Sequence, residues 1–273
     1  MLRRKIWILA ALVLLALPVG AQEATPKPLP GVDDLVAKYL AAIGGRDKLK
    51  AVQSVRMSGK MVMGQGMEAP FTVEMKRPKA VRMDFTFQGM TASSAFDGEK
   101  GWRVMPFQGS TAPEPLSADE IKQVKDQADI EGPLVDYKEK GSTVELVGKE
   151  SVEGADAFNL KITDKDGDVR NVYLHAEEYL PIKETMKRTI QGNEIELETS
   201  IGEYKDVGGL KFAHAIETKA KGMPTGQAMV IEKIELNVPV DPSRFQMPEA
   251  PKPEAAKPED KKPDAAKPPE EKK

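Results

Sequence analysis

The strongest constraint on the fold is an alternation of apolar and polar side chains that begins at Ser54 and recurs along most of the chain. Every second side chain is apolar in residues 55–63, 71–76 and 81–87. Successive side chains of a β-strand point to opposite faces of its sheet, so this period of two gives each strand one apolar and one polar face. The pattern predicts an antiparallel sheet that is covered on one face and wet on the other.

Further strands are predicted after these three, with turn sequences such as Asp166-Gly167 and Gly208-Gly209 between them. The predicted segments are 91–96, 101–106, 143–150, 155–163, 168–175, 181–190, 193–204, 210–221 and 227–237. About a dozen successive strands usually curl into a barrel or split into a sandwich. No linker interrupts residues 22–247, so we expect one domain there.

Two helices are predicted beside the strands. Apolar residues at helical spacing predict a helix over 32–43 that ends at Gly44-Gly45. Residues 107–116 are rich in turn formers and predict a loop, and a capping box of Ser117 and Glu120 after it predicts a second helix over 117–130. Its apolar stripe is only Ile121, Val124 and Ala128, so this helix should lie lightly on the body of the protein.

The two ends of the chain are predicted to lie outside the folded domain. Residues 1–21 have a basic start, twelve apolar residues and small side chains before Gln22, which is the pattern of a cleaved secretory signal peptide. Residues 248–273 contain only Pro, Lys, Asp, Glu and Ala, and such a tail is expected to stay disordered. The mature protein is therefore expected in the periplasm.

The sequence contains none of the motifs on which common enzymes depend. It has no cysteine, which excludes thiolate metal sites and disulfides, and no motif of a hydrolase, a zinc protease or a phosphate-binding loop. Its 40 basic and 43 acidic residues give no basic surplus for nucleic acid. Residues 164–168 resemble a calcium loop but fit a hairpin turn better, and His214 fits a hydrogen-bonded core position better than a ligand role. We expect no enzyme, no cofactor and no metal.

Methionines are frequent on the apolar side of the first predicted strands. Met57, Met61, Met63, Met75 and Met83 all share that register. Thioether side chains are flexible and polarisable, so they can repack around guests of different shape. Ordinary filling of a core would require the same residues, and composition alone does not separate the two explanations.

Several short motifs, in this order along the chain, resemble the periplasmic outer-membrane lipoprotein carrier family (LolA-like), one of the outer membrane lipoprotein-sorting proteins. Lys76-Arg77-Pro78 links two predicted strands, and residues 97–102 read Asp-Gly-Glu-Lys-Gly-Trp and are followed by Pro106. Residues 244–248 also resemble the closing strand of that family. The resemblance extends over most of residues 32–248.

The resemblance implies an α+β fold: a single strongly curved antiparallel sheet, the unclosed β-barrel of LolA and LolB, with a helical lid. The 117–130 helix would be part of the lid, and Arg77 would be the latch that holds the lid through its guanidinium group. The implied function is a monomeric periplasmic carrier that binds the acyl chains of lipoproteins or lipids and moves them toward the outer membrane. Membrane-bound donor and acceptor proteins would be its partners. A sensor or interaction module that detects lipoproteins with the same half-barrel is the alternative.

The inward side chains of four strands are the predicted ligand-binding residues. Exposed acyl chains cost about 0.8 kcal/mol per CH₂ in water, so a carrier needs an apolar concavity. The residues expected to line this hydrophobic cavity are Val55, Met57, Met61, Met63, Val73, Met75, Met83, Phe85, Phe87, Phe158, Leu160 and Ile162.

Overall fold

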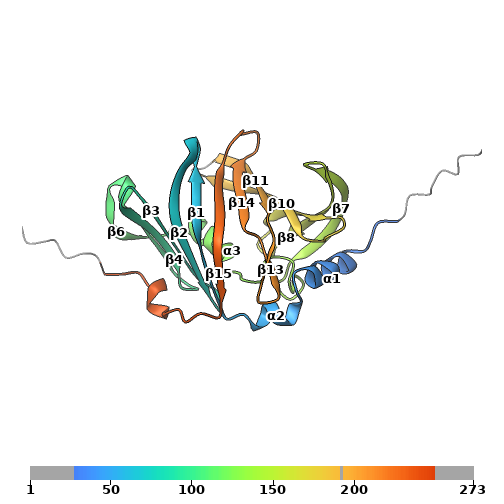
Figure 1. The fold of residues 1–273 in the computed structure, drawn as a ribbon, viewed down its shortest axis with the longest axis horizontal. Coiled ribbons are helices and arrows are strands. Elements are labelled where there is room, and N and C mark those ends of the chain that lie inside the picture. Colours follow the sequence, from blue (N-terminus) through green and yellow to red (C-terminus); the bar gives the residue numbers. More distant parts are fainter. Residues whose placement is uncertain (1–27, 191–192, 250–273) are drawn as a thin grey trace, which may run out of the picture. The chain divides into compact units, whose positions relative to one another are not determined.

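A computed structural model describes residues 28–190 and 193–249, and its dominant element is one large antiparallel sheet (Figure 1). Thirteen strands form this sheet in the order β6-β5-β4-β3-β2-β1-β15-β14-β11-β10-β9-β8-β7. The two outermost strands, β6 and β7, do not pair with each other, so the sheet is curved but not closed. This confirms the predicted α+β fold with a single unclosed sheet.

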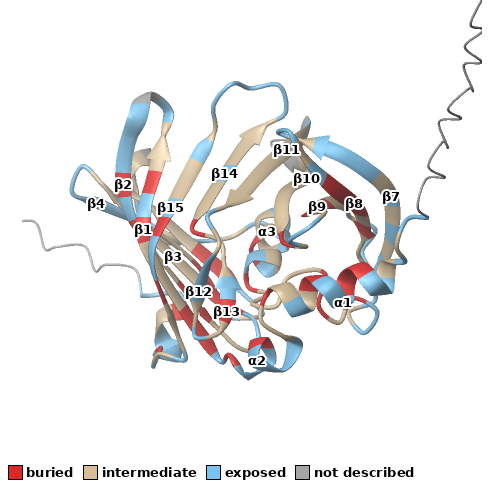
Figure 2. Ribbon diagram, turned by 45° about the vertical axis from the view of Figure 1, so that its right-hand side comes forward, coloured by how far each residue is buried: buried red, intermediate tan, exposed pale blue. Residues whose placement is uncertain are grey.

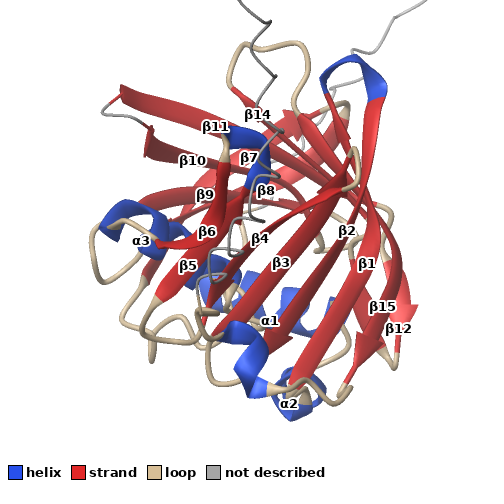
Figure 3. Cartoon of the chain, turned by 90° about the vertical axis from the view of Figure 1, so that its left-hand side faces the viewer, coloured by secondary structure: helices blue, strands red, loops and turns tan. Residues whose placement is uncertain are grey.

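The strands of the first half of the chain form one half of the sheet, where they lie next to one another (Figure 3). They are β1 (Ser54–Met63), β2 (Met67–Lys76), β3 (Ala80–Phe87), β4 (Met90–Phe96), β5 (Gly101–Met105) and β6 (Ser110–Pro115). Short 3₁₀ turns follow β1 and β5 at η1 (Gly64–Gly66) and η2 (Pro106–Gln108). The other half of the sheet contains β7 (Thr143–Val152), β8 (Ala155–Thr163), β9 (Val169–His175), β10 (Pro181–Ile190), β11 (Asn193–Gly202), β14 (Ala215–Ala220) and β15 (Gln227–Leu236).

The last strand joins the two halves of the sheet. β15 pairs with β1 on one side and with β14 on the other, so the end of the chain returns to its first strand. A bulge between Ser58 and Gly59 accommodates this pairing, and a Cβ on Gly59 would lie 2.0 Å from the carbonyl oxygen of Val230. Only glycine allows the two backbones to approach so closely.

Two predictions about strands were wrong. Residues 107–116 were expected to be a loop, but Ser110–Pro115 forms the edge strand β6, and an edge strand tolerates proline because one side of it needs no hydrogen bonds. The segment predicted as one strand over 210–221 is split into β13 (Leu210–Phe212) and β14. β13 pairs with β12 (Lys205–Val207) in a separate two-stranded sheet.

In the part of the chain that the structure describes, three α-helices accompany the sheet: α1 (Val32–Ala42), α2 (Arg46–Ala51) and α3 (Ala118–Gln127). α1 and α3 confirm the two predicted helices, and Ser117 and Glu120 form the expected capping box at the start of α3. α2 was not predicted because six residues are too few to show a helical period. None of the helices in the described residues is long and apolar enough to cross a membrane.

The main core lies on the inner face of the sheet, beneath the helices. Its fully buried side chains come from both halves of the sheet and from α1, and include Val55, Phe96, Leu160, Leu174 and Leu35. Figure 2 shows these buried segments together with α3, which lies inside the curve of the sheet. A smaller core on the outer face joins Ala80 to Val240 and Phe245 from the end of the chain. There the indole nitrogen of Trp102 donates to the carbonyl oxygen of Phe245 at 2.8 Å.

The predicted ends fall largely outside the described residues. The signal peptide over 1–21 lies outside them entirely, and the predicted tail over 248–273 does so beyond Glu249. Both remain predictions from the sequence.

We predict that the junction between α1 and α2 depends on glycine for two separable reasons. Gly44 and Gly45 have nearly equal positive φ values of 107° and 106°, but a Cβ on Gly44 would lie 2.1 Å from the carbonyl oxygen of Gly209, whereas a Cβ on Gly45 would meet nothing. Gly45→Ala should cost about 1–3 kcal/mol through backbone strain, because its ψ of 143° with positive φ lies close to a region that is essentially restricted to glycine. Gly44→Ala should cost about 1–3 kcal/mol more, because the junction cannot then pack on the β12–β13 hairpin.

Urea denaturation of both variants checks this prediction. Equal losses in the free energy of unfolding would show that the close approach of Gly44 to the hairpin contributes nothing.

Candidate functional site

The predicted ligand-binding residues share the inner face of the sheet. Directly paired residues of an antiparallel sheet lie on the same face, and the pairings Met57–Val73 and Val73–Met83 place the first three strands in one register. Phe158, Leu160 and Ile162 lie on the inner face of β8, and Leu160 pairs with Val172. The structure therefore brings both predicted sets to one apolar surface.

Much of this inner face is covered by the protein's own packing. The buried members of the predicted set are Val55, Met61, Met75, Phe158, Leu160 and Ile162. The partly buried members that pack against the same core are Met57, Met63, Val73, Met83 and Phe85. Of the predicted residues, Ile162 lines a pocket of about 270 Å³ beside α3, whose other lining residues are mostly charged or polar. An acyl chain would therefore reach this face only if a covering element moved.

The apolar surface becomes accessible at one end of β2, β3 and β4. Phe85 and Phe87 are half-buried and pack against Phe107, with ring centroids 5.7 and 6.1 Å away. Met90 pairs with Phe87 and is exposed, as is Met67, which pairs with Met63. The sequence prediction missed Phe107 because it stands in a segment that was expected to be a loop. It also missed Met67, which the alternation of β2 would have included if it had been extended four residues before Phe71.

Helix α3 covers the inner face through few apolar contacts. Val124 and Ala128 are buried, and Ile121 packs partly against the core. These are the three residues of the predicted thin stripe, and they confirm that the helix lies lightly on the sheet. Removing so small an apolar contact costs far less than removing a helix with a full apolar face.

Ion pairs attach α3 to both halves of the curved sheet. Near its start Glu120 pairs with Arg103 on β5, and Lys122 pairs with Asp168 in the turn before β9. Near its end the Asp126 carboxylate accepts hydrogen bonds from Arg170 on β9 at 2.7 Å and from Arg188 on β10 at 2.9 Å. Sequence reasoning found none of these pairs.

Asp126 belongs to a half-buried charged cluster within the apolar surroundings. Arg170 also donates to Glu184 at 3.1 Å, and we call Asp126, Arg170, Glu184 and Arg188 the Asp126 cluster. Burial raises the pKa of the Glu184 carboxyl, while the neighbouring Arg170 charge opposes that rise. Burial also disfavours the charge of Arg170, but Glu184 and Asp126 outweigh it and raise the pKa of the guanidinium.

Arg77 joins the end of α2 to the segment that follows α3. Its guanidinium donates to the carbonyl oxygens of Val52 at 2.6 Å and Leu49 at 3.2 Å, at the end of α2. It also pairs at 2.9 Å with Glu131, which follows α3 and is almost buried. The planar group thus contacts three acceptors at once, which a lysine could not do in the same geometry.

The other candidate residues behave as structural residues. His214 is buried, and its Nδ1 lies 2.7 Å from the carbonyl oxygen of Ile231, as expected of a core histidine. The Asp164 carboxylate accepts from the backbone N–H groups of Asp166 and Asp168, which makes residues 164–168 a hairpin turn. Within residues 28–190 and 193–249, no group of three or more His, Asp or Glu side chains is placed to hold a metal ion.

The attachment of α3 should weaken in acid. Partial burial raises the pKa of Glu120, but hydrogen bonds from Ser117 and the charge of Arg103 outweigh it and lower the pKa. A carboxyl with a lowered pKa stabilises the folded state above its unfolded value and loses that contribution as pH falls through the folded value. Below about pH 4 the amides of α3 should therefore exchange about two to five times faster, once intrinsic exchange is corrected.

Hydrogen exchange with mass spectrometry measures this change, and Glu120→Gln is the control. Glutamine keeps a capping box but does not titrate. If α3 in this variant loses as much protection in acid as in the wild type, Glu120 is not the group responsible.

Solved structures share the fold of this chain at low sequence identity. A DUF1329 family protein from Desulfovibrio piger aligns with a TM-score of 0.54 and 11% identity, over 79% of this chain and 97% of that one. A LolA superfamily protein from Nitrosomonas europaea aligns with a TM-score of 0.51 and 14% identity, over 78% of this chain and 96% of that one. No protein-family model and no curated protein matches the sequence. The chain has a LolA-like fold.

Proposed function

We propose that this protein is a non-catalytic periplasmic carrier that shelters the acyl chains of lipoproteins or lipids on the inner face of its sheet. The observation that supports this most directly is the way the apolar face is covered: α3 lies across it with a small apolar contact and charged attachments at both ends. The signal-like residues 1–21 support export, and the LolA-like fold supports a carrier.

The energetics of the cover suit reversible binding. Once α3 moves, the exposed groups at its start, Glu120 with Arg103 and Lys122 with Asp168, regain water, so breaking these two pairs costs little. The exposed apolar face, in contrast, is unfavourable in water until something apolar covers it. An acyl chain supplies that cover and contributes about 0.8 kcal/mol for each CH₂ removed from water.

The Met and Phe side chains at the accessible end of β2 to β4 offer an entrance to this face. Met67 and Met90 are exposed there, beside the half-buried rings of Phe85 and Phe87. Methionine adapts to chains of different shape at little cost, so this end suits a cargo that must enter and leave. Membrane-bound donor and acceptor proteins would load and unload the cargo, toward the outer membrane.

Charging the inner face should abolish cargo binding. Phe85→Glu places a carboxylate on the apolar side of β3, whereas Thr86→Glu places the same charge on the opposite side of the same strand. Native mass spectrometry of protein purified from periplasm should show acylated species on the wild type and on Thr86→Glu, and at least about tenfold less on Phe85→Glu. Wild-type protein that carries no acylated species under any condition would contradict the proposed function.

Arg77 is proposed as a latch between α2 and the segment after α3. Arg77→Leu removes its three contacts and should accelerate the transfer of a bound fluorescent fatty acid to lipid vesicles several-fold, with the fold intact by circular dichroism. Arg77→Lys keeps the charge without the planar fork and should give an intermediate rate. Transfer that is unchanged in both variants would rule out the latch.

A further inference from the structure

The Asp126 cluster contains two arginines that converge on one removable carboxylate. Both guanidinium groups donate to the same oxygen, Oδ2 of Asp126, although Arg170 and Arg188 belong to different strands. Their side chains are 16% and 15% exposed, so the sheet holds them largely buried, and Asp126 is their partner only while α3 is in place. Two fixed guanidinium groups at this spacing form a binding site for an anion with several oxygens.

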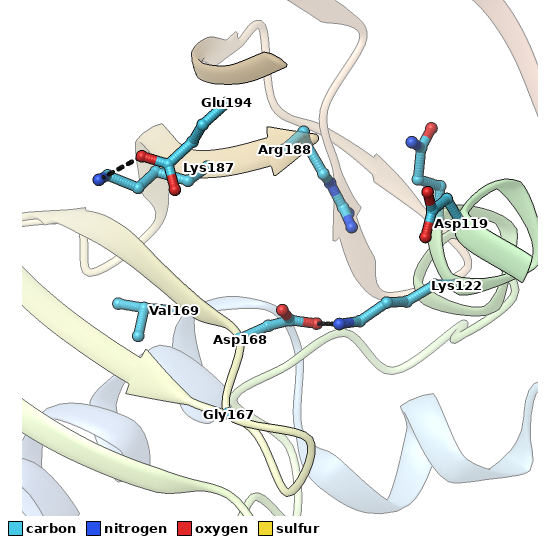
Figure 4. A pocket seen from close by; sticks show the side chains of 9 residues that line it. Asp119, Lys122, Gly167, Asp168, Val169, Lys187, Arg188 and Glu194 are labelled. Carbon is cyan, nitrogen blue, oxygen red and sulfur yellow. Dashed lines mark hydrogen bonds and ion pairs between the residues drawn. The ribbon is translucent and has the colours of Figure 1, made fainter. Parts of the chain in front are cut away.

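Space for a ligand exists on both sides of this pair. A pocket of about 290 Å³ is lined by Arg188, Lys122 and Asp168, and one of about 270 Å³ by Arg170, Asp126 and Ile162. In Figure 4 Lys187 pairs with Glu194 and Lys122 with Asp168, while Arg188 extends from β10 toward α3. Arg188 is thus the cation of that pocket whose charge is directed at the helix.

Moving α3 changes the charge balance of the inner face. Asp126 leaves with the helix, while Arg170, Arg188 and Glu184 stay on the strands, so two positive charges then face one negative charge. Lys122 also leaves, but its partner Asp168 lies in an exposed turn where water can solvate it. The half-buried arginines cannot be solvated as well and need a replacement anion.

Apolar surface adjoins the two arginines on the same face. Arg170 pairs directly with Ile162 across β8 and β9, and the next inward pair is Leu160 with Val172. All three of these apolar side chains are buried and belong to the main core. A ligand that places an anionic group on the arginines would therefore place an attached chain on the apolar face.

We propose that Arg170 and Arg188 bind the anionic head group, carboxylate or phosphate, of an acyl-chain ligand, and that this group takes the place of the Asp126 carboxylate when α3 moves. This inference rests on the proposed function and adds a preference for anionic amphiphiles over neutral ones. Asp126 acts as an internal substitute for the ligand, which keeps the arginines paired in the empty protein. Binding of the head group and release of the helix are then one exchange of anions.

The test compares sodium dodecanoate with uncharged dodecanamide, and with inorganic phosphate as the chain-free anion, by isothermal titration calorimetry at neutral pH. The wild type should bind dodecanoate at least about tenfold more tightly than dodecanamide and should not bind inorganic phosphate measurably. Arg188→Gln should lose about tenfold in affinity for dodecanoate and nothing for dodecanamide. Asp126→Asn should bind dodecanoate more tightly, because the competing carboxylate is gone.

Lys187→Gln is the matched control, since it removes the same charge from the neighbouring position, whose exposed side chain pairs with Glu194. It should leave both affinities unchanged, and circular dichroism verifies that each variant is folded. If the cluster only fastened the helix, Arg188→Gln would bind both amphiphiles more tightly, and that result overturns the inference.

The remaining outcomes separate this inference from the proposed function. Equal wild-type affinity for dodecanoate and dodecanamide overturns the head-group site and leaves the carrier standing. If inorganic phosphate binds as tightly as dodecanoate, the acyl chain contributes nothing to binding at the arginines. That result overturns the inference of an amphiphile ligand and identifies a site for free anions. Binding of neither amphiphile overturns the proposed function and this inference together.

Discussion

The unclosed sheet creates a physical problem to which much of the remaining structure is a response. A sheet that curves without closing has an apolar inner face, and the exposure of such a face to water is unfavourable. A closed barrel would cover this face with its own strands, and a sandwich would cover it with a second sheet. Here helices cover it, so what attaches those helices decides whether the face can ever be exposed.

The attachments of the helices differ in kind. α1 contributes Leu35, Val36 and Tyr39 to the buried core and is held by the same force that holds the strands together. α3 has Val124 as its buried apolar residue and is otherwise fixed by carboxylates and a lysine that reach the strands. Burial of a full apolar stripe stabilises a helix by several kcal/mol, whereas the exposed ion pairs at the start of α3 contribute little. Of the two, α3 has the smaller apolar contact with the sheet, and the proposed function therefore assigns the movement to it.

Charged contacts also occur beside the apolar core on the inner face of the sheet. Arg170 and Glu184 lie among core residues of β8 and β9, where charged groups are costly unless they are paired. Asp126 on α3 pairs with Arg170 and Arg188 on the strands. If α3 moved away, the inner face would therefore keep two positive charges and only the one negative charge of Glu184 in this cluster. Arg77 also makes charged contacts near the helices, where it joins the end of α2 to Glu131.

Much of the fold followed from periodicity. The alternation from Ser54 onward predicted the strands, and the 3.6-residue period from Val32 predicted α1, because both patterns are local properties of the chain. β6 was missed because prolines within Ser110–Pro115 look like a loop, and they are tolerated only at the edge that the strand occupies. α2 was too short to show a period.

The candidate site likewise has one part that local sequence patterns predicted and another part that they did not. By itself the sequence determined which side chains of each strand face inward, because alternation assigns them one by one, and it determined that the 117–130 helix has little apolar surface. Only the tertiary structure decided which charged residues meet. Asp126 is 44 residues from Arg170 and 62 from Arg188, and each looks like an ordinary surface charge in the sequence. They meet because strand order places β9 beside β10 and the curve of the sheet brings both to α3, and such long-range geometry leaves no local pattern to read.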